Sequence, residues 1–123
     1  MLVIDDDAGT VRVLQRALQV QGYEVITAED GESGLKLAAS HKADLAISIV
    51  DMGLPDTSGD LLCAELKKLV PGNPVLVCSG YADARSVQQV SEAGADGFLA
   101  KPFNREELAA AVRKALGGTD SER

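Results

Sequence analysis

A chain of 123 residues, of which 46% are hydrophobic, is long enough to form one domain with a packed interior without disulfides or a structural metal. Its formal net charge of -7 at pH 7 argues against a nucleic-acid or anionic-membrane surface, because such surfaces need clustered lysine and arginine to neutralise phosphates. We therefore expect a globular domain that contacts basic partners or cations, and neither nucleic acid nor membrane.

We expect neither a membrane anchor nor a secretory leader. No apolar run approaches the roughly 20 residues that a membrane helix needs, and no basic-then-apolar segment opens the chain. A cytoplasmic location is therefore expected. Met1 stands almost directly before the first predicted strand, so we expect either a domain excised from a longer protein or the loss of a few preceding residues.

Five short apolar runs predict strands. Each run is too short for a helix and is suited to a strand that helices cover on both faces. The predicted strands are residues 2–4, 25–27, 45–50, 75–78 and 98–100.

Apolar residues at spacings of three or four predict amphipathic helices between the strands. The segment 82–93 is the weakest of these, since it has only Ala84, Val87 and Val90 to bury. Asn104 is a plausible N-cap for the last helix, and Gly117 with Gly118 ends it. The apolar faces are Val11, Leu14 and Leu18; Leu62, Leu66 and Leu69; and Leu108, Val112 and Ala115.

Strands that alternate with helices indicate an α/β domain with a doubly wound, five-stranded parallel sheet and five helices on its two faces. The flavodoxin-like strand order 2-1-3-4-5 is the one we predict. The domain is expected to span residues 1–118, with residues 119–123 as a disordered polar tail.

The cysteines and the histidine suggest no catalytic role. Cys63 on a predicted helix and Cys78 in a predicted strand have apolar neighbours, so both are expected to be buried free thiols. His41 is the only histidine and stands at a polar helix end, where a solvated role is expected. No acyl-transfer triad can therefore be built from these residues.

Acidic residues and a lysine follow three of the predicted strands. Asp5, Asp6 and Asp7 follow the first strand, Asp51 follows the third, and Lys101 follows the fifth. In the predicted strand order the first and third strands lie side by side, so these groups would converge at one sheet edge. Carboxylates there suit a divalent cation, and the ammonium suits a phosphoryl group.

Four motifs occur in order at these strand ends. They are Leu-Val-Ile-Asp-Asp at 2–6, Asp-Met-Gly-Leu-Pro at 51–55 with Gly59 after it, Ser-Gly at 79–80, and Phe-Leu-Ala-Lys-Pro-Phe at 98–103. With this set the chain resembles, over nearly its whole length, the receiver domains of two-component response regulators.

The resemblance implies a phosphoacceptor and not an enzyme in the ordinary sense. Asp51 would take a phosphoryl group from a histidine kinase or a histidine phosphotransfer protein, and the domain would assist this transfer and its own dephosphorylation. It also implies a Mg²⁺ ion bound by Asp6, Asp51 and the carbonyl of Gly53, with Asp5 acting through water. Asp7 has no assigned role.

The same resemblance implies which groups bind the phosphoryl group and which change position when it is present. The Ser79 hydroxyl and the Lys101 ammonium would contact its oxygens, and the peptide bond from Lys101 to Pro102 is commonly cis in the family. Ser79 would move toward the phosphoryl group and Phe98 would swing inward, which changes the surface of the fourth helix, fifth strand and fifth helix.

Further implications concern kinetics and partners. Gly53 and Tyr81 flank the expected water path and would tune the lifetime of the phosphoryl group. The partner on the output side would be a downstream protein or an attached output domain, and the receiver itself a monomer or weak homodimer.

Simpler interpretations stand beside these. The acidic cluster could merely cap a helix, Asp51 could lie in a strand-exit turn, and Phe98 could be a core residue. A constitutive interaction module is one alternative function. A haloacid dehalogenase-like phosphotransferase is another, although Gly53 stands where that chemistry wants an acid.

One interval departs from the family pattern. From Gly31 to Asp51 the chain is about two residues longer than is usual for this part of the family, so residues 40–48 are expected to hold a longer loop or a shifted helix end.

Overall fold

The five predicted strands form one parallel sheet. The computed structural model describes residues 1–80 and 84–117, and the strand order within them is β2-β1-β3-β4-β5, as predicted. The strands are β1 (Leu2–Ile4), β2 (Ile26–Ala28), β3 (Ser48–Asp51), β4 (Val75–Ser79) and β5 (Gly97–Ala100).

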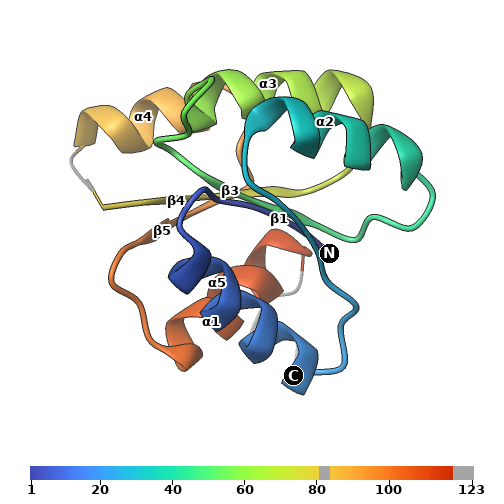
Figure 1. Cartoon of the computed structure of the whole chain (residues 1–123). Coiled ribbons are helices and arrows are strands. Elements are labelled where there is room, and N and C mark those ends of the chain that lie inside the picture. The colour runs from blue at the N-terminus through green and yellow to red at the C-terminus, as the bar shows by residue number, and fades with distance from the viewer. Residues whose placement is uncertain (81–83, 118–123) are drawn as a thin grey trace.

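Helices cover both faces of the sheet (Figure 1), with α2, α3 and α4 on one side and α1 and α5 on the other. No helix within the described ranges is long and apolar enough to cross a membrane. The helices are α1 (Ala8–Val20), α2 (Gly31–Ser40), α3 (Gly59–Leu69), α4 (Ala84–Glu92) and α5 (Arg105–Ala115).

Two hydrophobic clusters form the core, one on each face of the sheet. Successive strand residues point to opposite faces, so Leu2 and Ile4 belong to the cluster under α2 and α3, while Val3 belongs to the cluster under α1 and α5. The central strands are therefore buried on both faces. The edge strands differ from the prediction, since Thr27 in β2 and Ala100 in β5 are exposed. An edge strand has a neighbour on one side only, and coverage is incomplete there.

A loop of residues 41–47 joins α2 to β3, in the segment where a longer loop or a shifted helix end was predicted. The α2 helix ends at Ser40, and the amides of Asp44 and Leu45 both donate to the His41 carbonyl, which folds the chain into turns. As a result β3 begins only at Ser48, and the predicted strand start at residue 45 is wrong. β2 lies one residue later than predicted, β4 extends one residue further, and β5 begins one residue earlier.

The burial of α4 differs in part from the prediction. Val87 on α4 is 38% exposed and not buried, whereas Val90 is buried, so α4 attaches to the core through fewer residues than predicted. The predicted helix start at residue 82 and the Ala84 side chain lie outside the described part. His41 is half-buried at the C-cap of α2, and its Nδ1 donates to the Leu37 carbonyl at 3.0 Å, so it is only partly solvated.

The prediction of two buried free thiols is confirmed. Burial raises the pKa of the Cys63 thiol to about 11 and that of the Cys78 thiol to about 12. Because the thiolate is the reactive form, both side chains serve as small core residues.

The asparagine at the start of α5 caps the helix as predicted. Asn104 accepts the Glu107 amide at 2.7 Å, and the Glu107 side chain accepts the Asn104 amide at 3.0 Å. This reciprocal capping box fixes where the helix begins after Lys101.

Candidate functional site

Backbone hydrogen bonds continue the sheet just beyond three strand ends and hold the segments that carry the site. These bonds hold the backbone beyond each strand end in register with the neighbouring strand. The bonds run from the Asp5 amide to the Ala28 carbonyl at 3.1 Å, from the Met52 amide to the Cys78 carbonyl at 2.8 Å, and from the Lys101 amide to the Ser79 carbonyl at 2.8 Å.

Three carboxylates meet at this edge of the sheet. Asp5, Asp6 and Asp51 each offer an oxygen, and these oxygens lie within 4.8 Å of one another. Asp5 is buried, Asp51 is half-buried and Asp6 is exposed. The group therefore runs from the protein interior to the solvent, as an ion site that keeps several waters requires.

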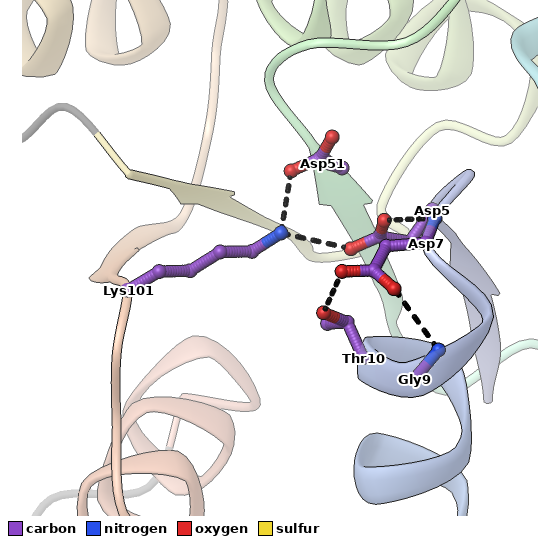
Figure 2. Close-up of polar contacts among 6 residues, drawn as sticks. All are labelled: Asp5, Asp7, Gly9, Thr10, Asp51 and Lys101. Atoms are coloured by element: carbon purple, nitrogen blue, oxygen red, sulfur yellow. Dashed lines mark hydrogen bonds and ion pairs between the residues drawn. The ribbon is translucent and has the colours of Figure 1, made fainter.

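Asp7, next to this group, has a different task. It is the N-cap of α1, and its carboxylate accepts the Gly9 amide at 3.0 Å and the Thr10 hydroxyl at 3.1 Å (Figure 2). The helix-capping interpretation of the acidic cluster thus holds for Asp7 alone.

Lys101 lies between two of the three carboxylates. Its Nζ donates to Asp51 Oδ1 at 2.8 Å and to Asp5 Oδ2 at 3.0 Å, and the other Asp5 oxygen accepts the Asp7 amide at 2.9 Å (Figure 2). Burial acts to lower the pKa of the Lys101 ammonium, but the hydrogen bonds and attraction to Asp51 and Asp5 outweigh it and raise the pKa. Lys101 is therefore held as a cation at the site. The Lys101–Pro102 peptide bond is cis, in agreement with the family pattern.

One ammonium does not balance three carboxylates. The formal charge of the group is two negative units, because Lys101 opposes Asp5, Asp6 and Asp51. Burial raises the pKa of the Asp51 carboxyl, and the Asp5 and Asp6 charges add to this, while the Lys101 hydrogen bond opposes it. The donor set, which consists only of hard oxygens with an excess of negative charge, fits a divalent cation such as Mg²⁺.

The other predicted site residues lie around this group in different ways. Ser79 is buried and pairs with Ala100, directly before Lys101. Phe98 is partly buried and packs against the core cluster under α2 and α3, and the simple core interpretation of it therefore stays open. Gly53 is exposed in the loop after β3. Tyr81 lies outside the described residues.

Hollows flank the acidic group on two sides. One of about 590 Å³ lies between the first turn of α1 and the segment after β5, and Val13, Lys101 and Phe103 contribute to its wall. The other, of about 200 Å³, is lined by Asp5 and Asp6 among others. The site is thus open on the Lys101 side and beside Asp6.

Sequence reasoning missed Asp56. Its carboxylate accepts the amides of Gly31 and Glu32 at 2.9 and 3.0 Å, which joins the loop after β3 to the start of α2. No local sequence pattern predicts these bonds, because Gly31 and Glu32 lie 25 and 24 residues before Asp56. Only the proximity of the two loops in the fold reveals it.

The loop after β3 returns very close to Asp51 at Gly59. The Gly59 amide donates to the Met52 carbonyl at 2.8 Å, and a Cβ at Gly59 would lie 2.8 Å from the Met52 Cα and 3.0 Å from the Asp51 carbonyl oxygen. Gly59→Ala must therefore push the backbone away from Asp51, and we expect it to lower the free energy of unfolding by about 1–3 kcal/mol.

Gly53→Ala is the matched control for Gly59→Ala, since a Cβ there meets nothing within 4 Å. We expect it to change the free energy of unfolding by less than about 0.5 kcal/mol. Urea denaturation of the two variants measures the difference. Equal stability of both would contradict the tight approach at Gly59.

A family comparison agrees with this geometry. The family model described as the response regulator receiver domain matches residues 1–113.

The chain belongs to the response regulator receiver domains.

Individual relatives support the same assignment. This receiver domain is 40% identical over 116 residues to the transcriptional regulatory protein KdpE of Mycobacterium tuberculosis, an alignment that covers 94% of this chain and 50% of KdpE. The chain thus spans about half the length of that curated relative.

Solved structures show the same fold. A receiver domain protein from Clostridium thermocellum superposes with a TM-score of 0.87 at 29% identity, covering 94% of this chain and 92% of that one. A response regulator from Burkholderia pseudomallei, solved with a phosphorylated aspartic acid, a calcium ion and citrate, gives 0.83 at 37% identity, covering 98% and 70% of the two chains.

Proposed function

We propose that this receiver domain accepts a phosphoryl group on Asp51 from a phosphohistidine of a histidine kinase or a histidine phosphotransfer protein, with Mg²⁺ bound beside it. The observation that carries the proposal is the convergence of the Asp5, Asp6 and Asp51 carboxylates within 4.8 Å, with Lys101 bonded to two of them. The phosphorylated aspartic acid and calcium ion of the Burkholderia relative lend it support.

The transfer needs an ionised Asp51. An oxygen of its carboxylate forms the new bond to phosphorus while the bond between phosphorus and the donor imidazole nitrogen breaks, and the imidazole leaves with the electron pair and then takes up a proton. The product is an acyl phosphate on Asp51.

Mg²⁺ would be held by Asp6 and Asp51 directly, by Asp5 through water and by the Gly53 carbonyl. When bound, it neutralises the carboxylates and the incoming phosphoryl oxygens and so lets two anions meet. Lys101, which bonds Asp51 and Asp5 here, would turn to one phosphoryl oxygen, and the Ser79 hydroxyl would donate to another.

The signal would leave the domain through a changed surface. We infer that Ser79 moves toward the phosphoryl group and that Phe98 moves inward, which alters the face formed by α4, β5 and α5. The limited burial of α4, where Val90 is buried but Val87 is 38% exposed, supports a helix that can shift. It stays a prediction that Gly53 and Tyr81 affect the lifetime of the phosphoryl group.

The proposed partners, cellular location and oligomeric state follow from this role. The domain would be a phosphoacceptor that assists its own transfer and dephosphorylation, and it would act on a downstream protein or an attached output domain. A cytoplasmic setting and a monomer or weak homodimer fit the role as well.

Intact mass after incubation with a small-molecule phosphodonor tests the proposal. We expect the addition of one phosphoryl group in the presence of Mg²⁺ and none when the metal is chelated, because the acidic group repels an anionic donor. No adduct with any donor, together with no Mg²⁺ binding, would favour the constitutive interaction module instead.

Mg²⁺ alone is expected to stabilise the fold. A metal ion that binds the folded chain and not the unfolded one raises the free energy of unfolding by about 2.7 kcal/mol when the ion concentration is one hundred times the dissociation constant. Thermal unfolding with and without Mg²⁺ measures this, with Asp6→Asn as the variant that loses most of the gain. A melting temperature that does not depend on Mg²⁺ would contradict a metal site at these carboxylates.

A further inference from the structure

The loop of residues 52–58 carries Gly53 and is closed at its base. The Gly59 amide donates to the Met52 carbonyl at 2.8 Å, and Gly53 and Ser58 form an isolated antiparallel bridge. These contacts join the two arms of the loop to each other. They do not by themselves fix where the loop lies relative to the rest of the domain.

A second attachment joins the loop to α2. The Asp56 carboxylate accepts the Gly31 amide at 2.9 Å and the Glu32 amide at 3.0 Å. The helix also has its own N-cap, because Asp30 accepts the Ser33 amide at 2.7 Å. The first turn of α2 thus has two carboxylate partners, one from its own chain segment and one from the loop after Asp51.

The hydrogen bonds of Asp56 keep it ionised. The Gly31 and Glu32 amides lower the pKa of the Asp56 carboxyl, although the side chain is exposed. A charged acceptor makes stronger hydrogen bonds than a neutral one. The α2 amides are therefore bound by a charged acceptor at neutral pH.

The helix on which the loop is anchored is itself fixed. A Cβ at Gly34 would lie 2.3 Å from Ile4 Cδ1, so α2 packs with its backbone close against β1. At the start of the helix a Cβ on Gly31 would lie 2.5 Å from Thr57 Cγ2, so the loop also touches the helix directly. The loop is thereby attached to an element that rests on the strand leading to Asp5.

We propose that Asp56 is a positioning residue for the phosphoryl-accepting site: its two bonds to α2 hold the loop of residues 52–58 where the Gly53 carbonyl can complete the metal site. Gly53 is exposed, and a Cβ there meets nothing within 4 Å, whereas the next residue, Leu54, is buried in the core cluster under α2 and α3 and anchors this arm of the loop. The bridge to Ser58 joins Gly53 to the other arm of the loop, and Asp56 attaches that arm to α2. This inference rests on the proposed function.

The test compares Asp56→Ala with Asp30→Ala by calorimetric titration with Mg²⁺. Each variant removes one carboxylate, and one cap, from the start of the same helix. Loss of a cap is expected to lower the melting temperature of both by about 4 °C. Only Asp56→Ala is expected to weaken Mg²⁺ binding, by at least about tenfold, as the loss of a group that orients a metal ligand does.

Asp56→Asn adds a rescue arm, because the amide keeps one acceptor oxygen for the α2 amides. We expect it to regain part of the lost Mg²⁺ affinity, with a circular dichroism spectrum like that of the unaltered chain. Unaltered Mg²⁺ affinity in Asp56→Ala, or an equal loss in Asp30→Ala, would overturn the inference. An unaltered chain that binds no Mg²⁺ would overturn the proposed function and this inference with it.

Discussion

Asp51→Asn is expected to abolish phosphoryl uptake. With a small-molecule phosphodonor and Mg²⁺, the unaltered chain gains the mass of one phosphoryl group and the variant gains none, because a neutral amide oxygen is a poor nucleophile and cannot form an acyl phosphate. Intact mass spectrometry reads both outcomes directly. Treatment with hydroxylamine removes an acyl phosphate and leaves a serine or threonine phosphate in place.

Asp7→Asn is the matched control. It makes the same chemical change in the same acidic cluster, but Asp7 lies outside the group of three carboxylates and caps α1, a task that asparagine performs as well. The control should be phosphorylated like the unaltered chain. A hydroxylamine-resistant adduct that persisted in Asp51→Asn would move the acceptor to a hydroxyl group, with buried Ser79 as the first to examine.

Lys101→Ala is expected to have opposite effects on transfer and on metal binding. Loss of the ammonium removes a charge that would stabilise the transferring phosphoryl group, and we expect the rate of phosphoryl uptake to fall about 10²-fold or more. Mg²⁺ affinity should rise instead, since Lys101 Nζ now bonds oxygens of Asp51 and Asp5. A unit positive charge about 4 Å from a divalent cation costs about 2 kcal/mol even in water, which is roughly 30-fold in affinity.

Initial rates of phosphoryl uptake and a Mg²⁺ titration separate the two effects. Lys67→Ala is the control, because it removes a lysine paired with Asp96, which precedes β5 and accepts the amide of Val75 at the start of β4, at the sheet edge opposite the site. It should leave both quantities unchanged. Transfer at the normal rate in Lys101→Ala would remove Lys101 from the reaction and leave it as a counter-charge for the acidic group.

The sequence by itself determined the fold and the set of groups at the sheet edge. Short apolar runs and helical spacings are local periodic signals, and five of each in alternation admit few topologies. The strand order then brings the ends of β1 and β3 side by side, so Asp5 and Asp51 had to be close. For this reason the convergence of Asp5, Asp6, Asp51 and Lys101 could be expected from the sequence.

Local signals placed the ends of elements less well. Leu45 belongs to an apolar run that reads as a strand, but the turn at His41 holds it outside β3. Val87 has the spacing of a buried face, yet it is 38% exposed because few neighbours cover α4. The spacing of apolar residues predicts which face of a helix is apolar, but it does not predict how completely neighbouring elements bury that face.

Only the tertiary structure decided which role each of the three consecutive aspartates has. Asp5, Asp6 and Asp7 are consecutive and chemically identical, yet Asp5 is buried against Lys101, Asp6 faces solvent, and Asp7 caps α1. Which way each points depends on the bend of the chain as it leaves β1 for α1. The bond from Asp56 to α2 was decided in the same way, because a contact between residues 25 positions apart is set by how two loops meet in space and not by any pattern along the chain.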